Sequence, residues 1–146
     1  MFSPLRNQVD PLLEQQISRE KEKGISMAQF DVTTMKFNAD GLIPAIAQDH
    51  TSGEVLMMAW MNAESIQRTL NTGNVTYWSR SRQAFWVKGL TSGNTQQLKA
   101  FRFDCDRDCI LVKVVQKGPA CHTNRISCFY TQVENNTEVE LTKPIS

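Results

Sequence analysis

The sequence lacks a long hydrophobic run, and this excludes a transmembrane helix of ordinary length. Its longest uninterrupted apolar stretch extends only from Val55 to Met61, whereas a helix needs about 20 apolar residues to cross a bilayer. The N-terminus also lacks the basic start, apolar stretch and small-residue cleavage site of a secretory signal. We therefore expect a soluble cytoplasmic protein that has no membrane partner.

The sequence also has little net charge. Sixteen lysines and arginines against 15 aspartates and glutamates leave a net charge of +1. A protein with this balance has no overall field that would attract it to nucleic acid or to a membrane surface. We expect no nucleic-acid partner, and any anionic ligand must be held by local groups.

Internal repeats and low-complexity tracts are absent, and 146 residues suffice for one hydrophobic core. We interpret residues 1–30 as an N-terminal extension, 31–135 as a single domain and 136–146 as a polar C-terminal tail. Within the extension, the stretch from Val9 to Lys23 can form a charged helix that ends near Gly24.

The domain has the pattern of an α+β fold. Apolar runs at Leu42–Ala47 and Val55–Met61 enclose turn-forming residues, which predicts a β-hairpin. Asn62 is a good N-cap and Gly73 a good C′ residue for one firm, short helix. Further strands are predicted at Val75–Trp78, Phe85–Lys88, Leu98–Asp104, Cys109–Gln116 and Ser127–Gln132. We expect a mostly antiparallel sheet.

The cysteines are few but lie close together, at positions 105, 109, 121 and 128. Without a secretory signal, this clustering favours a metal site over disulfides. Cys121 and Cys128 are separated more widely than the cysteines of a zinc-finger knuckle, but a loop can bring both to one ion. With Cys105 they give three sulfur ligands, as in catalytic zinc sites that keep a fourth position open. Cys109 begins a hydrophobic strand, and we interpret it as a small buried residue.

His122 directly follows a candidate ligand and is one of only two histidines in the chain. It can be a fourth zinc ligand, a general acid/base or a hydrogen-bonded structural residue. We favour the general acid/base role. The other histidine, His50, lies in the predicted hairpin turn, and we interpret it as solvated.

Asp104, Asp106 and Asp108 alternate with Cys105 and Arg107. In an extended segment the three carboxylates share one face, and the other two side chains point away. Such oxygen ligands suit a hard ion such as Mg²⁺. The residues alone leave open whether this is a magnesium site or a solvated acidic turn.

A polar belt follows the predicted strands on either side of Gln83. Its arginines, lysine, hydroxyls and glycine are groups that bind phosphate through forked donors and backbone N–H groups. The candidate substrate-binding residues are Trp78, Arg80, Arg82, Lys88, Thr91, Ser92, Gly93 and Asn94.

Taken together, these motifs resemble the phosphoribosyl-AMP cyclohydrolases of histidine biosynthesis. The resemblance covers roughly Leu42 to Tyr130, in the order and spacing of that family. It is carried by Trp-Ser-Arg-Ser-Arg ending at Arg82, Thr-Ser-Gly-Asn ending at Asn94, Asp-Cys-Asp-x-Asp ending at Asp108, and Gly-Pro-Ala-Cys-His-Thr ending at Thr123 with Ser-Cys-Phe ending at Phe129.

The resemblance implies that water opens the adenine ring of 1-(5-phosphoribosyl)-AMP between N1 and C6. It implies that Cys105, Cys121 and Cys128 bind zinc and that Asp104, Asp106 and Asp108 bind magnesium. It also implies a homodimeric β-rich pseudo-barrel whose zinc site is completed across the subunit interface. Many relatives carry a fused second domain for phosphoribosyl-ATP pyrophosphohydrolase, and we expect this monofunctional chain to perform only the one step.

The implied reaction fits the chemistry of these residues. Zinc lowers the pKa of bound water to about 7 and so supplies hydroxide for attack on a ring carbon. His122 can transfer the proton to the departing N1, while the basic belt holds the two 5′-phosphates. Asn124 stands where the family usually has glycine, and asparagine tolerates the left-handed conformation better than most residues. Leu90 stands where the family often has glutamate.

Two other kinds of zinc protein use similar ligands. A zinc-dependent nucleobase deaminase carries H-x-E and P-C-x-x-C signatures, and the sequence contains neither. A small nucleic-acid-binding protein with a structural zinc would close its site with a fourth ligand, Cys109 or His122. An open coordination position would favour the enzyme.

Overall fold

The computed structural model describes residues 11–22, 24 and 27–145, which belong to two compact units, Met1–Asp31 and Val32–Ser146. In the first unit, helix α1 spans Pro11–Glu22 and falls inside the helix predicted between Val9 and Lys23. In the part of the chain that the structure describes, no helix is both long enough and apolar enough to cross a membrane.

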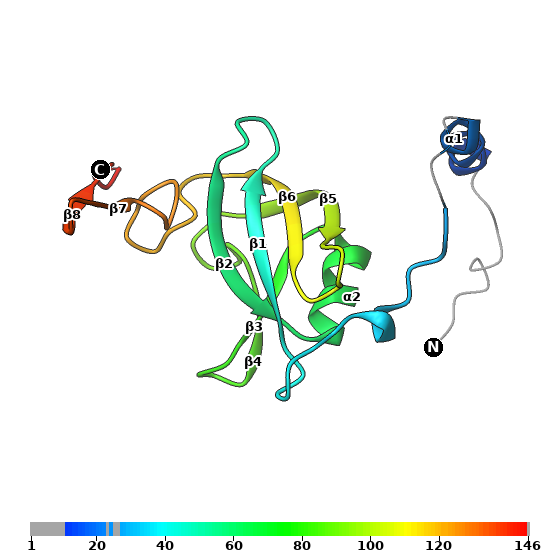
Figure 1. Ribbon diagram of the computed structural model, residues 1–146, viewed down its shortest axis with the longest axis horizontal. Coiled ribbons are helices and arrows are strands. Elements are labelled where there is room, and N and C mark those ends of the chain that lie inside the picture. Colours follow the sequence, from blue (N-terminus) through cyan, green and yellow to red (C-terminus); the bar gives the residue numbers. More distant parts are fainter. Residues whose placement is uncertain (1–10, 23, 25–26, 146) are drawn as a thin grey trace. The chain divides into compact units, whose positions relative to one another are not determined.

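The second unit has the α+β architecture that the sequence predicts (Figure 1). Its elements are η2 (Val32–Thr34), β1 (Ile43–Asp49), β2 (Val55–Met61), α2 (Ala63–Thr72), β3 (Thr76–Ser79), β4 (Ala84–Val87), β5 (Gln96–Phe103), β6 (Ile110–Gln116), β7 (Thr131–Glu134) and β8 (Thr137–Glu140). Six strands form one sheet in the order β4-β3-β2-β1-β6-β5, and β7 pairs with β8. Only the β1–β6 pair is parallel, so the predicted mostly antiparallel sheet is confirmed.

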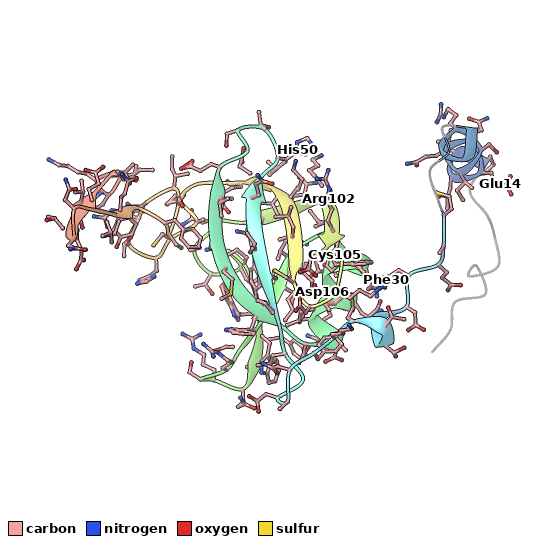
Figure 2. All side chains as sticks on the ribbon, viewed as in Figure 1. Glu14, Phe30, His50, Arg102, Cys105 and Asp106 are labelled. Atoms are coloured by element: carbon pink, nitrogen blue, oxygen red, sulfur yellow. The ribbon has the colours of Figure 1, made fainter. Side chains whose placement is uncertain are left out.

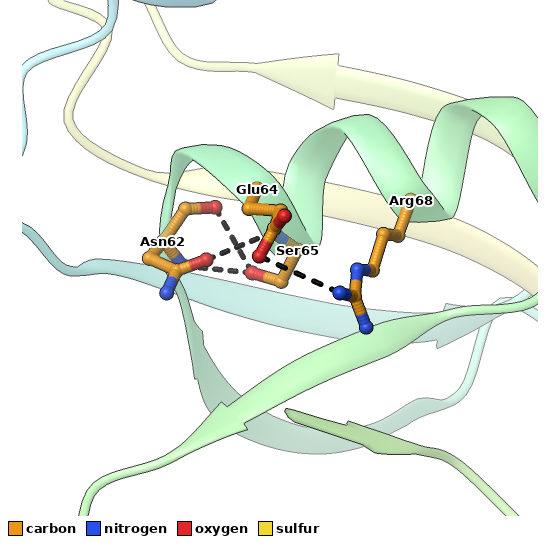
Figure 3. A network of polar contacts seen from close by, with 4 residues as sticks. All are labelled: Asn62, Glu64, Ser65 and Arg68. Atoms are coloured by element: carbon orange, nitrogen blue, oxygen red, sulfur yellow. Dashed lines mark hydrogen bonds and ion pairs between the residues drawn. The ribbon is translucent and has the colours of Figure 1, made fainter. Parts of the chain in front are cut away.

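The predicted hairpin and its helix are both present. Strands β1 and β2 pair antiparallel, with Ile43 opposite Met61. At the start of α2 the Asn62 side chain accepts a hydrogen bond from Ser65 N at 2.8 Å, and Ser65 Oγ accepts one from Asn62 N at 2.7 Å (Figure 3). This reciprocal cap satisfies two N–H groups that the helix itself cannot pair. The helix ends at Gly73, whose φ of 77° is the left-handed conformation that glycine adopts without strain.

The six-stranded sheet curls strongly, as Figure 1 shows, because β5 also bonds to the segment before β3. Val75 N donates to Gln96 O at 3.1 Å, and Leu98 N donates to Gly73 O at 2.8 Å. Inside the curl the buried Tyr77 hydroxyl donates to Gln96 Oε1 at 2.7 Å. These bonds connect the two halves of the sheet and give it a half-barrel form, as expected for a β-rich pseudo-barrel.

The structure differs from the sequence prediction near the C-terminus. Residues 127–130 were expected to begin a strand, but 117–130 form an irregular loop and β7 begins only at Thr131. Ser127 Oγ donates to Val55 O at 2.7 Å and Cys128 N donates to Leu56 O at 2.7 Å, so this stretch is fixed on β2 by separate contacts. The segment 136–146, interpreted from the sequence as a polar tail, contains β8, which forms a hairpin with β7 through Asn135 and Asn136. The φ values of these two residues, 49° and 60°, suit a tight hairpin turn.

Candidate active site

The acidic motif lies in the loop that joins β5 to β6, and the loop is a turn rather than an extended segment. Asp104 N donates to Cys109 O at 3.0 Å, Arg107 N donates to Asp104 O at 3.1 Å, and Arg107 has a φ of 64°. The expectation of an extended strand with alternating faces is therefore wrong here. The chain must reverse direction within a few residues because Phe103 and Ile110 pair across the hairpin.

The turn nevertheless gathers the three carboxylates. Oxygens of Asp104, Asp106 and Asp108 lie within 4.8 Å of one another, and all three residues are exposed. Among the described residues, no other set of three or more histidine, cysteine or acidic side chains meets that distance. An exposed group of three carboxylates matches the oxygen donors that a hard divalent cation prefers.

The pKa values of Asp104 and Asp108 in this acidic loop are shifted in opposite directions. Hydrogen bonding to Asp106 and Asp104, which favours a protonated Asp108, raises the pKa of Asp108 to about 6. For Asp104, loss of solvent acts to raise the pKa, but hydrogen bonds from Asp108 and from the N–H groups of Asp108 and Cys109 outweigh it and lower the pKa. A cation that binds here removes the repulsion by which the neighbouring carboxylates keep a proton on Asp108.

The 117–130 loop brings Cys121 and Cys128 together. Burial acts to raise the pKa of Cys121, but hydrogen bonds from Thr123, at 3.0 Å from the sulfur, and from Cys128 outweigh it and lower that pKa. Burial around the Cys128 sulfur, together with its bond to Cys121, raises the pKa of Cys128 to about 11, although the residue as a whole is exposed. Two adjacent sulfurs, one of which ionises readily, are a fitting donor pair for zinc.

Two further candidate residues are linked to this thiol pair, Lys88 by charge and His122 by its place in the chain. Lys88 is near enough for the charges of both thiols to act on it, although burial has the larger effect and lowers the pKa of Lys88. His122 is exposed on the same loop, next to Cys121.

Cys109 lies outside this pair, in the loop before β6. It is half-buried, and burial, followed by the charge of Asp104, raises the pKa of its thiol.

Cys105 does not join the other two proposed zinc ligands within one chain. It lies in the loop before β6, and the thiol pair lies in the loop after β6. Figure 2 shows Cys105 and Asp106 at one end of this strand and His50 at the other, where its N–H donates to Val114 O. Seven residues of strand span about 20 Å, so the two loops are about a strand length apart.

Long-range contacts hold the thiol loop. Arg125 is buried, and its guanidinium stacks 3.9 Å from the Tyr130 ring centroid, donates to Thr142 O at 3.0 Å and lies 3.4 Å from Glu140. Asn124 has a φ of 67°, the left-handed conformation anticipated where the family usually has glycine. Both its side chain and its backbone oxygen bond to Ile145. Thr142 and Ile145, near the C-terminal end of the described chain, therefore hold the thiol loop in place.

Half of the predicted polar belt lines one cavity of about 670 Å³. Arg82, Lys88, Thr91 and Ser92 face it, together with Arg68, Ser79, Ser81, Phe85, Trp86, Val87, Gly89 and Leu90. Trp78 and Arg80 instead line a separate hollow of about 390 Å³ with Asp40, Leu42, Asn62 and Gln83. Leu90, at the position where the family often has glutamate, is 77% exposed.

Gly93 and Asn94 shape the turn beside the larger cavity. Gly93 N donates to Gly89 O at 2.8 Å. A Cβ at Gly89 would lie 2.3 Å from the Asn94 carbonyl carbon, so only glycine allows this close approach. These residues fix the course of the loop that carries Thr91 and Ser92.

Sequence reasoning missed two residues of this region, Arg68 and Arg125. Arg68 lies on the predicted helix, where a charged side chain is most simply interpreted as solvated. Arg125 lies inside the motif that predicts the thiol loop, but its partners are far along the chain. The aromatic residues Phe85 and Tyr130, over which the two guanidinium groups stack, were the available signal.

Comparison with known proteins identifies related sequences. The sequence model of the family described as phosphoribosyl-AMP cyclohydrolase matches residues 57–130. A phosphoribosyl-AMP cyclohydrolase of Ruegeria pomeroyi is 67% identical over 116 residues, which are 80% of this chain and 98% of that protein. Proteins of the same name from Dinoroseobacter shibae and Paracoccus denitrificans are 63% and 64% identical over 80% and 79% of this chain, and over 98% and 95% of their own lengths.

Proposed function

The chain belongs to the phosphoribosyl-AMP cyclohydrolase family, and from this premise we propose that it hydrolyses 1-(5-phosphoribosyl)-AMP in histidine biosynthesis. The reaction opens the adenine ring between N1 and C6. The observation that carries the proposal is that the charges of the Cys121–Cys128 pair reach Lys88, which lines a cavity of about 670 Å³. Paired sulfurs next to a cationic cavity suit metal-assisted hydrolysis of an anionic substrate.

Zinc is the metal that this donor set suits. Cys121 and Cys128 would supply two thiolates and Cys105 a third, which leaves a coordination position for water. When bound, zinc lowers the pKa of such a water to about 7 and so makes hydroxide available at neutral pH. The lowered pKa of Cys121 supports this role because the thiolate is the form that binds metal.

The distance between the two loops supports a homodimer with shared zinc sites. Because the acidic loop and the thiol loop lie at opposite ends of β6, Cys105 of one chain is expected to meet Cys121 and Cys128 of a second chain. A two-fold symmetric pair would then contain two equivalent sites, since each chain gives one loop to each site.

The remaining candidate residues have separate roles in this proposal. His122, exposed beside Cys121, would deliver a proton to the departing N1. Asp104, Asp106 and Asp108 would bind magnesium, for which their exposed cluster of oxygens is suited. Arg82, Lys88, Thr91 and Ser92 would bind the substrate in the larger cavity, Gly93 and Asn94 would shape its rim, and Trp78 and Arg80 would border the neighbouring hollow.

A cytoplasmic location is part of the same proposal. All four cysteines are free thiols in the structure. Thiols that serve as metal ligands require a compartment that keeps them reduced.

The direct test is turnover of phosphoribosyl-AMP, followed by the absorbance change as the ring opens. The zinc-loaded protein should turn the substrate over, a chelator should abolish turnover, and added zinc should restore it. A zinc-loaded, folded protein that leaves phosphoribosyl-AMP unchanged would contradict the proposed activity. Full activity after complete zinc removal would contradict the proposed role of the metal.

A further inference from the structure

The larger cavity has an excess of positive charge. Three of the side chains that line it, Arg68, Arg82 and Lys88, are cationic, and none of its described lining residues is acidic. The rest of the lining is hydroxyl-bearing, aromatic or aliphatic, with one glycine. A concave surface of this kind concentrates the field of its cations and attracts an anionic ligand.

Arg68 is oriented at this cavity by two contacts. Its guanidinium carbon lies 3.9 Å from the centroid of the Phe85 ring, which also lines the cavity. One guanidinium nitrogen lies 3.5 Å from Glu64 Oε2, one helical turn earlier (Figure 3). Stacking and ion pair together restrict the plane of the guanidinium, so less entropy is lost when it binds a ligand.

The ion pair leaves Arg68 available to a stronger anion. Only one nitrogen meets Glu64, at 3.5 Å, and the side chains of Arg68 and Glu64 are 49% and 61% exposed. Solvent screens an exposed pair of this kind, and such pairs contribute little. A phosphate dianion carries more charge and can accept two parallel bonds from the guanidinium fork.

Arg82 lies on the same cavity and is fixed by the turn between β3 and β4. Its backbone N–H donates to Ser79 Oγ at 3.2 Å, and the hydroxyls of Ser79 and Ser81 lie 3.4 Å apart. Both serines line the cavity as well. Two guanidinium forks with several hydroxyls form a donor set that suits a phosphomonoester better than a neutral ring.

We propose that Arg68 binds a phosphate group of the nucleotide substrate, together with Arg82. This inference rests on the proposed function, because that function supplies a ligand with two 5′-phosphates. Lys88 would then contact the part of the ligand nearer the thiol pair, because the charges of both Cys121 and Cys128 reach it. Arg68 is thus a substrate-binding residue contributed by α2, outside the polar belt.

Binding of AMP and of adenosine to the zinc-loaded full chain, measured by calorimetry, tests this assignment because the two ligands differ only in the phosphate. The wild-type chain should prefer AMP. Arg68→Ala should weaken AMP binding about tenfold, the lower end of the range for a charge-assisted hydrogen bond, and leave adenosine binding unchanged. The matched control is Arg102→Ala, which removes an exposed arginine of β5 that is not part of this cavity and should change neither affinity.

Several outcomes would overturn the assignment. One is a wild-type chain that binds AMP no more tightly than adenosine. Another is an Arg68→Ala chain that keeps the wild-type preference for AMP. The third is an Arg68→Ala chain that loses equal affinity for AMP and for adenosine. If Arg68→Ala does not fold, Arg68→Gln carries the same test, because it keeps a long side chain over Phe85 without the charge. Arg68→Lys should recover part of the preference, since it restores the charge but not the fork.

The turnover assay separates this inference from the proposed function. In an active enzyme, Arg68→Ala should raise the KM for phosphoribosyl-AMP more than it lowers kcat. An unaltered KM in an active enzyme refutes the role of Arg68 alone. A chain that shows the AMP-to-adenosine contrast but never opens the ring refutes the proposed function alone.

Discussion

The two loops at the ends of β6 hold their functional side chains in opposite ways. The acidic loop is short, the Asp104 carboxylate accepts its hydrogen bonds from within the loop, and the three carboxylates come together within one chain. Arg107 in addition bonds to the distant residues Thr34 and Lys36. The thiol loop is long, is fixed by distant residues such as Leu56 and Thr142, and brings together only two of the three expected ligands. The carboxylates of one candidate site thus meet within one chain, whereas the thiol loop lacks one expected ligand, which a partner chain would supply.

The largest expected effect is at the thiol loop. Cys121→Ser and Cys128→Ser should each lose bound zinc and lower turnover at least about a thousandfold, because a hydroxyl replaces thiolate poorly as a ligand. Cys109→Ala, which removes a half-buried thiol from the loop at the other end of β6, is the matched control and should keep both. Zinc content by mass spectrometry and turnover are the measurements. Loss of stoichiometric zinc in Cys109→Ala, with retention in either of the other variants, would reverse the assignment.

His122→Ala should lower kcat by about 10²–10⁴-fold, the range typical of general acid/base groups. Zinc content and substrate affinity should be unchanged, and the pH–rate profile should lose one limb. If His122 is a ligand instead, zinc binding should weaken and excess zinc should partly restore the rate. A purely structural residue would lower Tm while turnover per folded, zinc-loaded molecule stays normal.

The acidic loop should respond to pH and magnesium without loss of zinc. Magnesium must displace the proton of Asp108, whose pKa is about 6, so affinity should fall as pH drops through that value. Between about pH 7 and about pH 5 one competing proton predicts roughly a tenfold loss. Asp108→Asn should bind magnesium weakly and remove this pH dependence, and Asp106→Asn should raise the magnesium needed for turnover. Calorimetry on the zinc-loaded chain measures the magnesium affinity, and turnover at a series of magnesium concentrations measures the requirement. A magnesium affinity that does not change with pH would indicate that the cluster is only a solvated acidic turn.

The smallest effect is expected at the tether of the thiol loop. Arg125→Ala should lower the free energy of unfolding by about 1–3 kcal/mol, because it removes a buried stack and a charge-assisted bond to a carbonyl. Glu140→Gln, which changes only the exposed partner of the ion pair, should cost less than about 1 kcal/mol. Thermal and urea unfolding measure both. Equal losses in the two variants would show that the ion pair, rather than the buried stack, holds the loop.

Local signals in the sequence predicted the local structure well. Asn62 and Gly73 set the ends of α2 because their capping bonds reach only a few residues. The strand predicted at Ser127–Gln132 was wrong for residues 127–130, because their partners, Val55 and Leu56, lie far away in the chain. Arg125 was missed for the same reason, because its partners Thr142 and Glu140 are also distant in the chain. The acidic cluster was predicted correctly even though its backbone forms a turn instead of the expected extended strand.

Family motifs predicted the candidate ligands, but periodicity could not say which of them meet in one chain. Cys121 and Cys128 meet because the loop folds back on itself between them. Cys105 is separated from both by the length of β6, a fact that depends on the order of the strands rather than on spacing in the sequence.

The most direct test of the shared zinc site mixes two inactive variants. Cys105→Ser and Cys121→Ser chains, unfolded and refolded together, form mixed dimers in which one of the two sites regains all three cysteines. With random pairing, half of the dimers are mixed, and turnover should recover to about a quarter of the wild-type value. Cys121→Ser mixed with Cys128→Ser is the matched control. Both substitutions fall in the thiol loop, so every site in every dimer contains one substituted cysteine, and this mixture should stay inactive. Recovery in the first mixture alone is the predicted result, and an inactive first mixture with mixed dimers verified by mass spectrometry would contradict a zinc site built from two chains.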